Sequence, residues 1–259
     1  MAALVVIAPS PSWRLAVVLA VLLAVAVAAS YVGRLGVERN HLTAAGRAVV
    51  QLAVVSVVIA AALASLWWSV AFACLMFAVA TFTSSGRIRV PRRQIPWVGV
   101  AIASGAAPVL VLIFASGVIP LNGKGIVPIA GIVIGNMMTA ATLTGRRAYD
   151  EIGGSFGTYE AGLALGLSSP EAAFEVMAPT AKEALTPGLD QTRTVGLVTL
   201  PGAFIGVLLG GGTPLQAGAA QILVLIGLMA GQAIVAGVLL RLIAHARVVR
   251  KDLLAAYPR

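Results

Sequence analysis

The stretch that decides the fold is residues 194–240, which read TVGLVTLPGAFIGVLLGGGTPLQAGAAQILVLIGLMAGQAIVAGVLL without a charged side chain. One helix crosses the hydrocarbon core of a membrane in about 20 residues, so this 47-residue run has room for two crossings. Glycine and proline interrupt helices, and they place the turn between the two crossings at residues 210–214, Gly-Gly-Gly-Thr-Pro. The stretch therefore predicts a helical membrane protein.

The same pattern extends over the rest of the 259-residue chain. Further charge-free runs lie at 15–33, 48–86, 94–123 and 125–145, and the second of them divides near Ser65. Hydrophobic residues make up 59% of the chain and charged residues 10%, which excludes a soluble globular protein. We predict an all-α polytopic membrane protein, one domain over residues 1–259, with seven transmembrane helices at 14–33, 48–65, 68–86, 96–118, 125–144, 194–211 and 215–240.

The positions of the basic residues predict the orientation. Sixteen of the 18 Lys and Arg residues fall in alternate segments between the spans, and the positive-inside rule places such segments in the cytoplasm. The chain is therefore predicted to be a multi-pass protein of the cell membrane, N-out and C-in. Its net charge of +9 then reflects topology and contact with anionic membrane lipids rather than a nucleic-acid partner.

Ionisable side chains are missing from the interior of the predicted spans. Proton relays and intramembrane proteases need such groups, so no catalytic residue and no enzymatic activity are predicted. Gly117 to Lys124 differs from a phosphate-binding loop, because five residues separate its glycines instead of four and Gly125 replaces the Ser or Thr. We predict no cofactor in this chain, and uphill transport would draw its energy from another chain.

The segment 145–193 is the longest between two spans, and it carries seven of the nine carboxylates. Loops of this length usually have a function. Its sequence predicts two short cytoplasmic helices joined by a turn at Gly166, with Ser169 as the N-cap of the second helix, Pro170 at its first position and Glu171 in its first turn.

This segment resembles the EAA loop of ABC transporter permeases. The resemblance rests on Glu160-Ala161-Gly162, on Gly166 four residues later, and on Val176-x-Ala178-Pro179. Gly162 and Ala178 depart from the usual pattern, which has Ala and Leu there. In that family the loop is the coupling helix that sits in a groove of the ATPase, so the resemblance implies a set of ATPase-coupling residues: Glu160, Ala161, Gly162, Gly166 and Pro179.

Three further motifs resemble the FetB-type permeases, a family associated with iron export and related to plant aluminium-tolerance permeases. They are residues 46–52, 127–138 and 194–202, and the resemblance runs from about residue 34 to residue 250. It implies a permease domain that exports iron or another metal ion. It also implies a separate FetA-type ABC ATPase as the partner that binds ATP and Mg²⁺, and a permease homodimer.

Polar side chains at membrane depth are candidates for the translocation path. With their neighbours they are Gln51, Asn136, Met137, Met138, Thr139 and Gln221. Asn136 could instead make an interhelical hydrogen bond. Asp190 could form a cytoplasmic gate with Arg47 or Arg193, although charges at the ends of spans are often interface anchors.

Two glycine ladders predict close helix packing, either within one subunit or between two permease copies. Their members are Gly131, Gly135, Gly202, Gly206 and Gly210. The metal ligands stay unknown, because iron favours carboxylate or imidazole groups and the spans contain neither. The alternative function is an ATP-independent membrane facilitator or scaffold whose 145–193 loop binds a partner other than an ATPase.

Overall fold

The computed structural model describes residues 12–256, and its regular elements are all helices. Within this part of the chain the only β-type pairing is an isolated bridge between Val195 and Thr199. The chain divides into two compact units between Ala61 and Ala62, and each is described by itself. The prediction of an all-α protein is confirmed.

The first unit contains α1 (Trp13–Val32) and most of α2 (Glu38–Ala64). A left-handed Gly36 lies in the turn between them, and the Ser30 hydroxyl lies 2.9 Å from His41 Nε2. Most of their apolar side chains are exposed. Such all-round apolar surfaces suit helices that face lipid.

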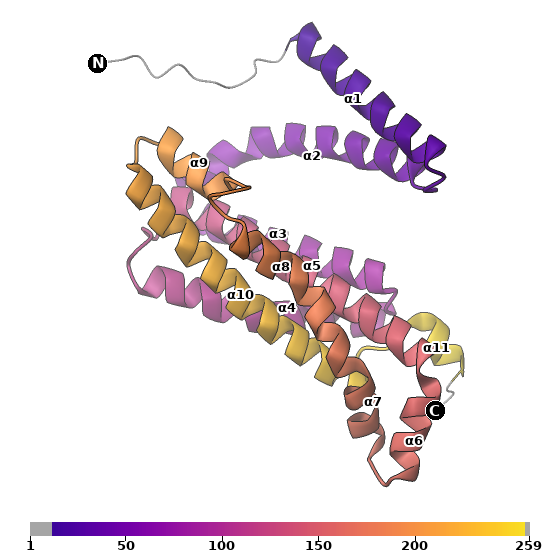
Figure 1. Cartoon of the computed structure of the whole chain (residues 1–259). Coiled ribbons are helices and arrows are strands. Elements are labelled where there is room, and N and C mark those ends of the chain that lie inside the picture. The colour runs from indigo at the N-terminus through magenta and orange to yellow at the C-terminus, as the bar shows by residue number, and fades with distance from the viewer. Residues whose placement is uncertain (1–11, 257–259) are drawn as a thin grey trace. The chain divides into compact units, whose positions relative to one another are not determined.

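The core of the second unit is built by α3 (Leu66–Ile88), α4 (Ile95–Ala115, preceded by a 3-10 turn at Arg92–Gln94), α5 (Gly123–Gly154) and α10 (Pro214–Ala244) (Figure 1). A Cβ on Gly105 of α4 would overlap the carbonyl group of Gly231 in α10. A Cβ on Gly231 would in turn lie 2.9 Å from Met137 Sδ of α5. These two glycines allow α4, α5 and α10 to pack with their backbones close together.

Six helical stretches are long and apolar enough to cross a membrane: α1, α2, α3, Arg92–Ala115, α5 and α10. They match six of the predicted spans. The predicted seventh, 194–211, does not form one helix within the described residues, because only α9 (Gly202–Leu209) is helical there and it is about 12 Å long. Gly196, at φ +83°, and Pro201 explain the interruption, since neither suits a helix interior.

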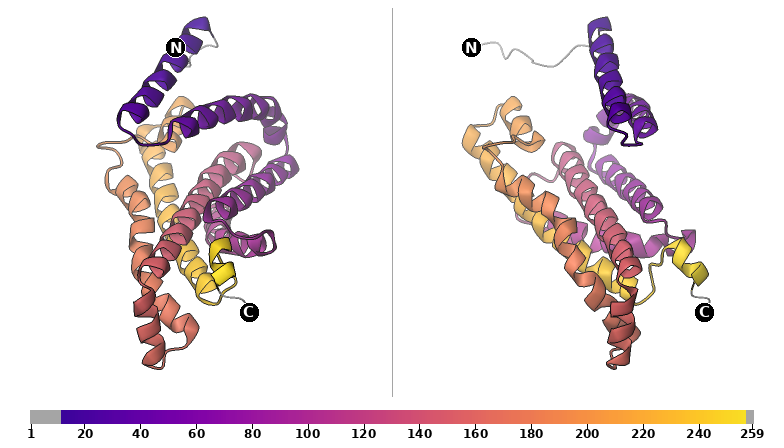
Figure 2. Two further views of the ribbon diagram at one scale, coloured as in Figure 1. Left: turned by 90° about the vertical axis from the view of Figure 1, so that its right-hand side faces the viewer. Right: turned by 45° about the vertical axis from the view of Figure 1, so that its right-hand side comes forward.

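The predicted cytoplasmic loop 145–193 is largely helical. Its first ten residues continue α5, and they are followed by α6 (Phe156–Ala164), α7 (Ser169–Met177), a 3-10 turn at Ala178–Thr180 and α8 (Ala181–Arg193). α7 and α8 pack against α10, and α8 runs beside α10 in both views of Figure 2. The last part of this segment is thus not free loop but part of the packed helical unit.

The residues after α10 fold back onto the second unit. The Tyr149 hydroxyl donates a hydrogen bond of 2.5 Å to the Val248 carbonyl, and the Val249 amide donates one of 2.7 Å to Gln94 Oε1. The short helix α11 (Lys251–Ala256) follows. These two bonds hold the residues after α10 against α5 and the start of α4.

Candidate functional site

The helical hairpin α6–α7 carries the motif that resembles the coupling loop. α6 ends in a left-handed Gly166 (φ +93°), whose amide donates 3.0 Å to the Leu163 carbonyl, while the Leu167 amide donates 3.1 Å to the Gly162 carbonyl. This pair of bonds is a Schellman ending, which favours glycine at the left-handed position. A Cβ on Gly162 would lie 3.1 Å from Ala172 Cβ, so the small residue also lets α6 approach α7.

The start of α7 lies one residue earlier than predicted, since the N-cap is Ser168 rather than Ser169. The Glu171 carboxylate accepts hydrogen bonds from the Ser168 hydroxyl (2.6 Å) and the Ser168 amide (2.9 Å). A capping box needs its acidic residue three positions after the N-cap. Glu171 is three positions after Ser168 but only two after Ser169, so Ser168 is the N-cap. The two bonds from Ser168 hold the pKa of Glu171 below its usual value.

This cap predicts a pH-dependent hairpin. Because folding lowers the pKa of Glu171, its stabilisation is present at neutral pH and is lost as the pH falls through that lowered value. Ser168→Ala removes the hydroxyl donor, so we expect severalfold faster hydrogen exchange in the first turn of α7 at neutral pH. Exchange should converge with that of the native chain in acid. Equal exchange at neutral pH would contradict this role of Ser168.

The end of the hairpin presents three leucines to the outside. Leu165 is 85% exposed, Leu163 40% and Leu167 39%, and we call these three residues the hairpin tip. Three exposed carboxylates also lie on the two helices of the hairpin: Glu160, Glu171 and Glu175. Of the other motif residues, Ala161 is exposed on α6 and Pro179 lies exposed in the 3-10 turn after α7. The hairpin thus combines exposed leucines at its turn with exposed carboxylates on its helices.

The candidate path residues of the second unit do not share one surface. Asn136 Oδ1 accepts a 3.3 Å hydrogen bond from Gln232 Nε2, which joins α5 to α10. Met137 is buried in the core, whereas Met138 is half-buried and the Thr139 hydroxyl bonds the carbonyl of Gly135 one turn earlier. Gln51 belongs to the first unit. In the described residues Asn136 therefore makes an interhelical hydrogen bond.

Gln232 is a polar core residue that the sequence analysis missed. It lies 11 residues after Gln221, which is about three helical turns and puts both amides on one face of α10. Gln221 is buried, and its Oε1 accepts a 3.2 Å bond from the Phe204 amide of α9. The 11-residue spacing of Gln221 and Gln232 could have predicted this polar face of α10 from the sequence.

The candidate gate residues fall into different parts of the chain. Asp190 and Arg193 form an ion pair on α8, with 3.1 Å between Oδ1 and Nη1, and both side chains are exposed. Arg47 lies on α2 in the first unit. Within its own unit, Asp190 is therefore paired with Arg193, which follows it by one helical turn on α8.

The glycine ladders contribute little to packing within the chain. A Cβ on Gly135, Gly202 or Gly206 would meet no atom within 4 Å in the described structure. Gly131 makes ordinary contact with Met76 Sδ at 3.5 Å, and Gly210 meets only its own helix. Close helix contacts lie instead at glycines outside the predicted ladders, among them Gly105 and Gly231.

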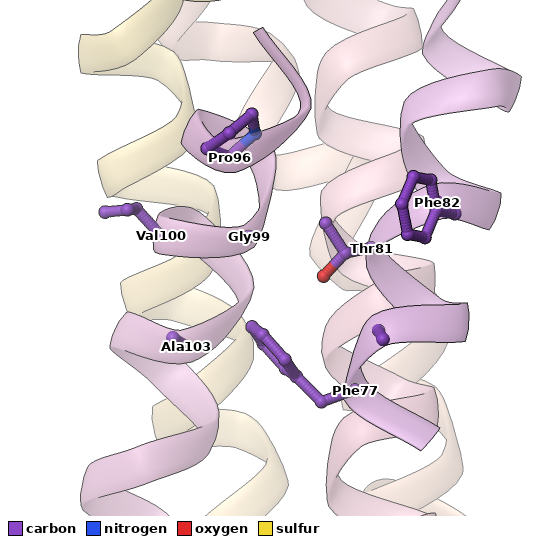
Figure 3. Close-up of a pocket in the computed structure, with 8 residues that line it drawn as sticks. Phe77, Thr81, Phe82, Pro96, Gly99, Val100 and Ala103 are labelled. Atoms are coloured by element: carbon purple, nitrogen blue, oxygen red, sulfur yellow. The ribbon is translucent and has the colours of Figure 1, made fainter. Parts of the chain in front are cut away.

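No group of three or more His, Cys, Asp or Glu side chains that could hold a metal ion is found among residues 12–256. A pocket of about 340 Å³ lies between α3 and α4 (Figure 3), where Phe77, Phe82, Pro96 and Val100 line it. Its only hydroxyl is that of Thr81. This pocket supplies no set of metal ligands.

The six long apolar helices define a multi-pass helical membrane protein. The sequence profile of the uncharacterised protein family UPF0014 matches residues 13–248. The chain therefore belongs to this family.

Relatives in plants and bacteria cover most of the chain. The rice "UPF0014 membrane protein STAR2" is 35% identical over 80% of this chain and 73% of the relative. "Protein ALUMINUM SENSITIVE 3" of Arabidopsis thaliana is 32% identical over 84% of this chain and 80% of the relative. The "Probable iron export permease protein FetB" of Escherichia coli K12 is 28% identical over 78% and 79%. The resemblance to FetB-type permeases is thereby confirmed, and no solved structure matches the chain.

Proposed function

We propose that this chain is the membrane subunit of an ABC transporter that exports iron or another metal ion, and that a separate ATPase subunit binds ATP and Mg²⁺. The observation that carries the proposal is the α6–α7 hairpin, in which the motif's Gly166 turns the chain and the leucine tip is exposed. The iron in this proposal comes from the name of the Escherichia coli relative.

The hairpin tip has the surface properties of a docking site. Exposed apolar side chains with a polar border are typical of protein interfaces. Its carboxylates predict a complementary basic border around an apolar groove on the ATPase. The hydrogen bonds of the Schellman ending and of the capping box fix the conformation of the hairpin. Binding would therefore not lose the entropy that ordering a mobile segment costs.

The connections of the hairpin suit the transmission of movement. α6 follows α5 directly, and α7 leads through the 3-10 turn into α8, which packs against α10. An ion pair of 3.4 Å between Arg147 of α5 and Glu183 of α8 also links the two sides of the hairpin's base. A displacement of the tip would therefore reach two helices that cross the membrane.

A homodimer is part of the proposal. An ABC transporter pairs two membrane halves with two ATPases, and this chain has the length of one half. Gly202 and Gly206 support it, because a Cβ on either residue would meet no atom within 4 Å in the described structure, so α9 can accept a closely packed helix there.

Transport by reconstituted vesicles tests the function. We expect vesicles that contain this chain and its ATPase partner to move Fe²⁺ across the membrane only when Mg²⁺-ATP is supplied on the ATPase side. A catalytically inactive ATPase gives the matched control. Equal Fe²⁺ movement without ATP would contradict the proposal and would favour the ATP-independent facilitator.

A further inference from the structure

The segment from α8 to α9 runs back along the middle of α10. At one end, Gly188 of α8 lies so close to Gln232 that a Cβ on Gly188 would overlap the amide. At the other end, the Phe204 amide donates to Gln221 Oε1. Gln221 and Gln232 are 11 residues apart on α10, a rise of about 17 Å. Residues 189–203 therefore pass the centre of the charge-free run 215–240.

The α8 end of this segment is polar, and its middle part is not helical. It carries the Asp190–Arg193 ion pair, followed by the irregular residues 194–201 that connect α8 to α9 (Figure 1). Gly196 in this connection is left-handed. Within the part of the chain that the structure describes, the carbonyl oxygens of residues 195–198 accept no hydrogen bond. Thr199 is exposed, and Leu197 is 92% exposed.

Lipid is an unsuitable environment for such a segment. At the depth of the hydrocarbon core, non-helical backbone is tolerated only where protein buries it or where it lines a water-filled cavity. The second unit itself does not bury residues 196–200. Charged side chains at this depth usually mark a route for substrate or ions, and interrupted helices in transporters place free carbonyl groups near the middle of the membrane.

We propose that α8, residues 194–201 and α9 form one discontinuous crossing, whose irregular middle lines an aqueous permeation path half way through the membrane. This inference rests on the proposed function and names its substrate site. The path supplies two kinds of ligand, the Asp190 carboxylate and the carbonyl oxygens of residues 195–198. Oxygen ligands of both kinds bind hard cations. Arg193 pairs with the Asp190 carboxylate at 3.1 Å, so an arriving cation competes with it. Asp190 and Arg193 are then part of the path and not a gate at the cytoplasmic surface.

Cross-linking tests the position of the segment. Cys74 is the only cysteine, so a Cys74→Ala chain provides a thiol-free background. In it we expect a short bifunctional thiol reagent to join the pair Gly188→Cys/Gln232→Cys and the pair Phe204→Cys/Gln221→Cys, detected as linked peptides by mass spectrometry. The control pair Phe204→Cys/Gln232→Cys, which leaves Gly188 unchanged, should not be joined. Absence of both links in folded protein would overturn the proposal.

Thiol accessibility tests the aqueous path. In sealed vesicles, a charged, membrane-impermeant methanethiosulfonate should label Thr199→Cys at least tenfold faster than Ile226→Cys. Ile226 is an exposed apolar residue of α10 that lies between Gln221 and Gln232 in the sequence. Mn²⁺ should slow the labelling of Thr199→Cys, and Asp190→Asn should remove this protection.

Each result decides one part of the proposal. Equal, slow labelling at both positions would mean that protein covers the segment, and it would overturn the path. Labelling that Mn²⁺ does not slow would overturn the cation site. These measurements need no ATPase, so a negative result does not contradict the proposed coupling to the ATPase. Equally, a chain that does not bind the ATPase would not contradict the permeation path.

Discussion

Leu165→Asp is expected to abolish the association of this chain with its ATPase. Leu165 is the most exposed residue of the hairpin tip, so the change should leave the fold of the permease intact. In the complex, however, it would bury an unpaired carboxylate in an apolar groove. A buried charge of this kind costs several kcal/mol, and about 4 kcal/mol weakens an equilibrium by roughly a thousandfold. Co-purification of the two proteins from membranes measures the effect.

Thr158→Asp is the matched control for this change. Thr158 lies exposed in the first turn of α6, at the other end of that helix from the tip. A carboxylate in the first turn of a helix is favourable, so this variant adds the same charge to the same hairpin without touching the tip. We expect it to retain the ATPase. Loss of the ATPase from both variants, or from neither, would show that the tip is not the contact surface.

Gly105→Ala is expected to destabilise the second unit strongly. A Cβ on Gly105 would overlap the carbonyl group of Gly231 and lie 2.5 Å from Val235 Cγ2. The backbone of α10 cannot move aside as a side chain can, so α4 and α10 must separate. Overpacking of this kind costs about 1–3 kcal/mol, occasionally more. Thermal unfolding in detergent should show a clearly lower transition temperature and less monodisperse protein.

Gly135→Ala separates this clash from the general effect of replacing a helical glycine. A Cβ on Gly135 meets no atom within 4 Å, and alanine favours a helix by about 1 kcal/mol over glycine. We expect this variant to be as stable as the native chain or slightly more so. A loss equal to that of Gly105→Ala would contradict the assignment of the close helix contact to Gly105.

The membrane helices could be predicted because charge and apolar length are properties of the sequence itself. The run 125–145 predicted α5 in this way, and 215–240 predicted α10. The same reasoning failed at 194–211, which is equally apolar but contains Gly196 and Pro201. Composition shows how much apolar chain there is but not whether the backbone stays helical.

The position of Asp190 could not be predicted for a related reason. A charged residue between two apolar runs suggests the end of a span, and the contact of Gly188 with Gln232 that places α8 beside α10 is a tertiary one. Local signals worked better, since the turn at Gly166 followed from the sequence and the N-cap of α7 was displaced by only one residue. The close helix contact at Gly105 could not be predicted, because an isolated glycine lacks the repeated spacing that marks a glycine ladder.

The most direct test of the central claim is the ATP hydrolysis of the stand-alone ABC ATPase, measured with and without this chain in lipid nanodiscs. The proposed coupling predicts a stable complex whose hydrolysis rate depends on the native hairpin. Replacement of Glu160 by Ala together with Gly166 by Leu should remove that dependence, because the left-handed turn at Gly166 does not accept a side chain without strain. A folded native chain that neither binds the ATPase nor changes its rate would contradict the claim.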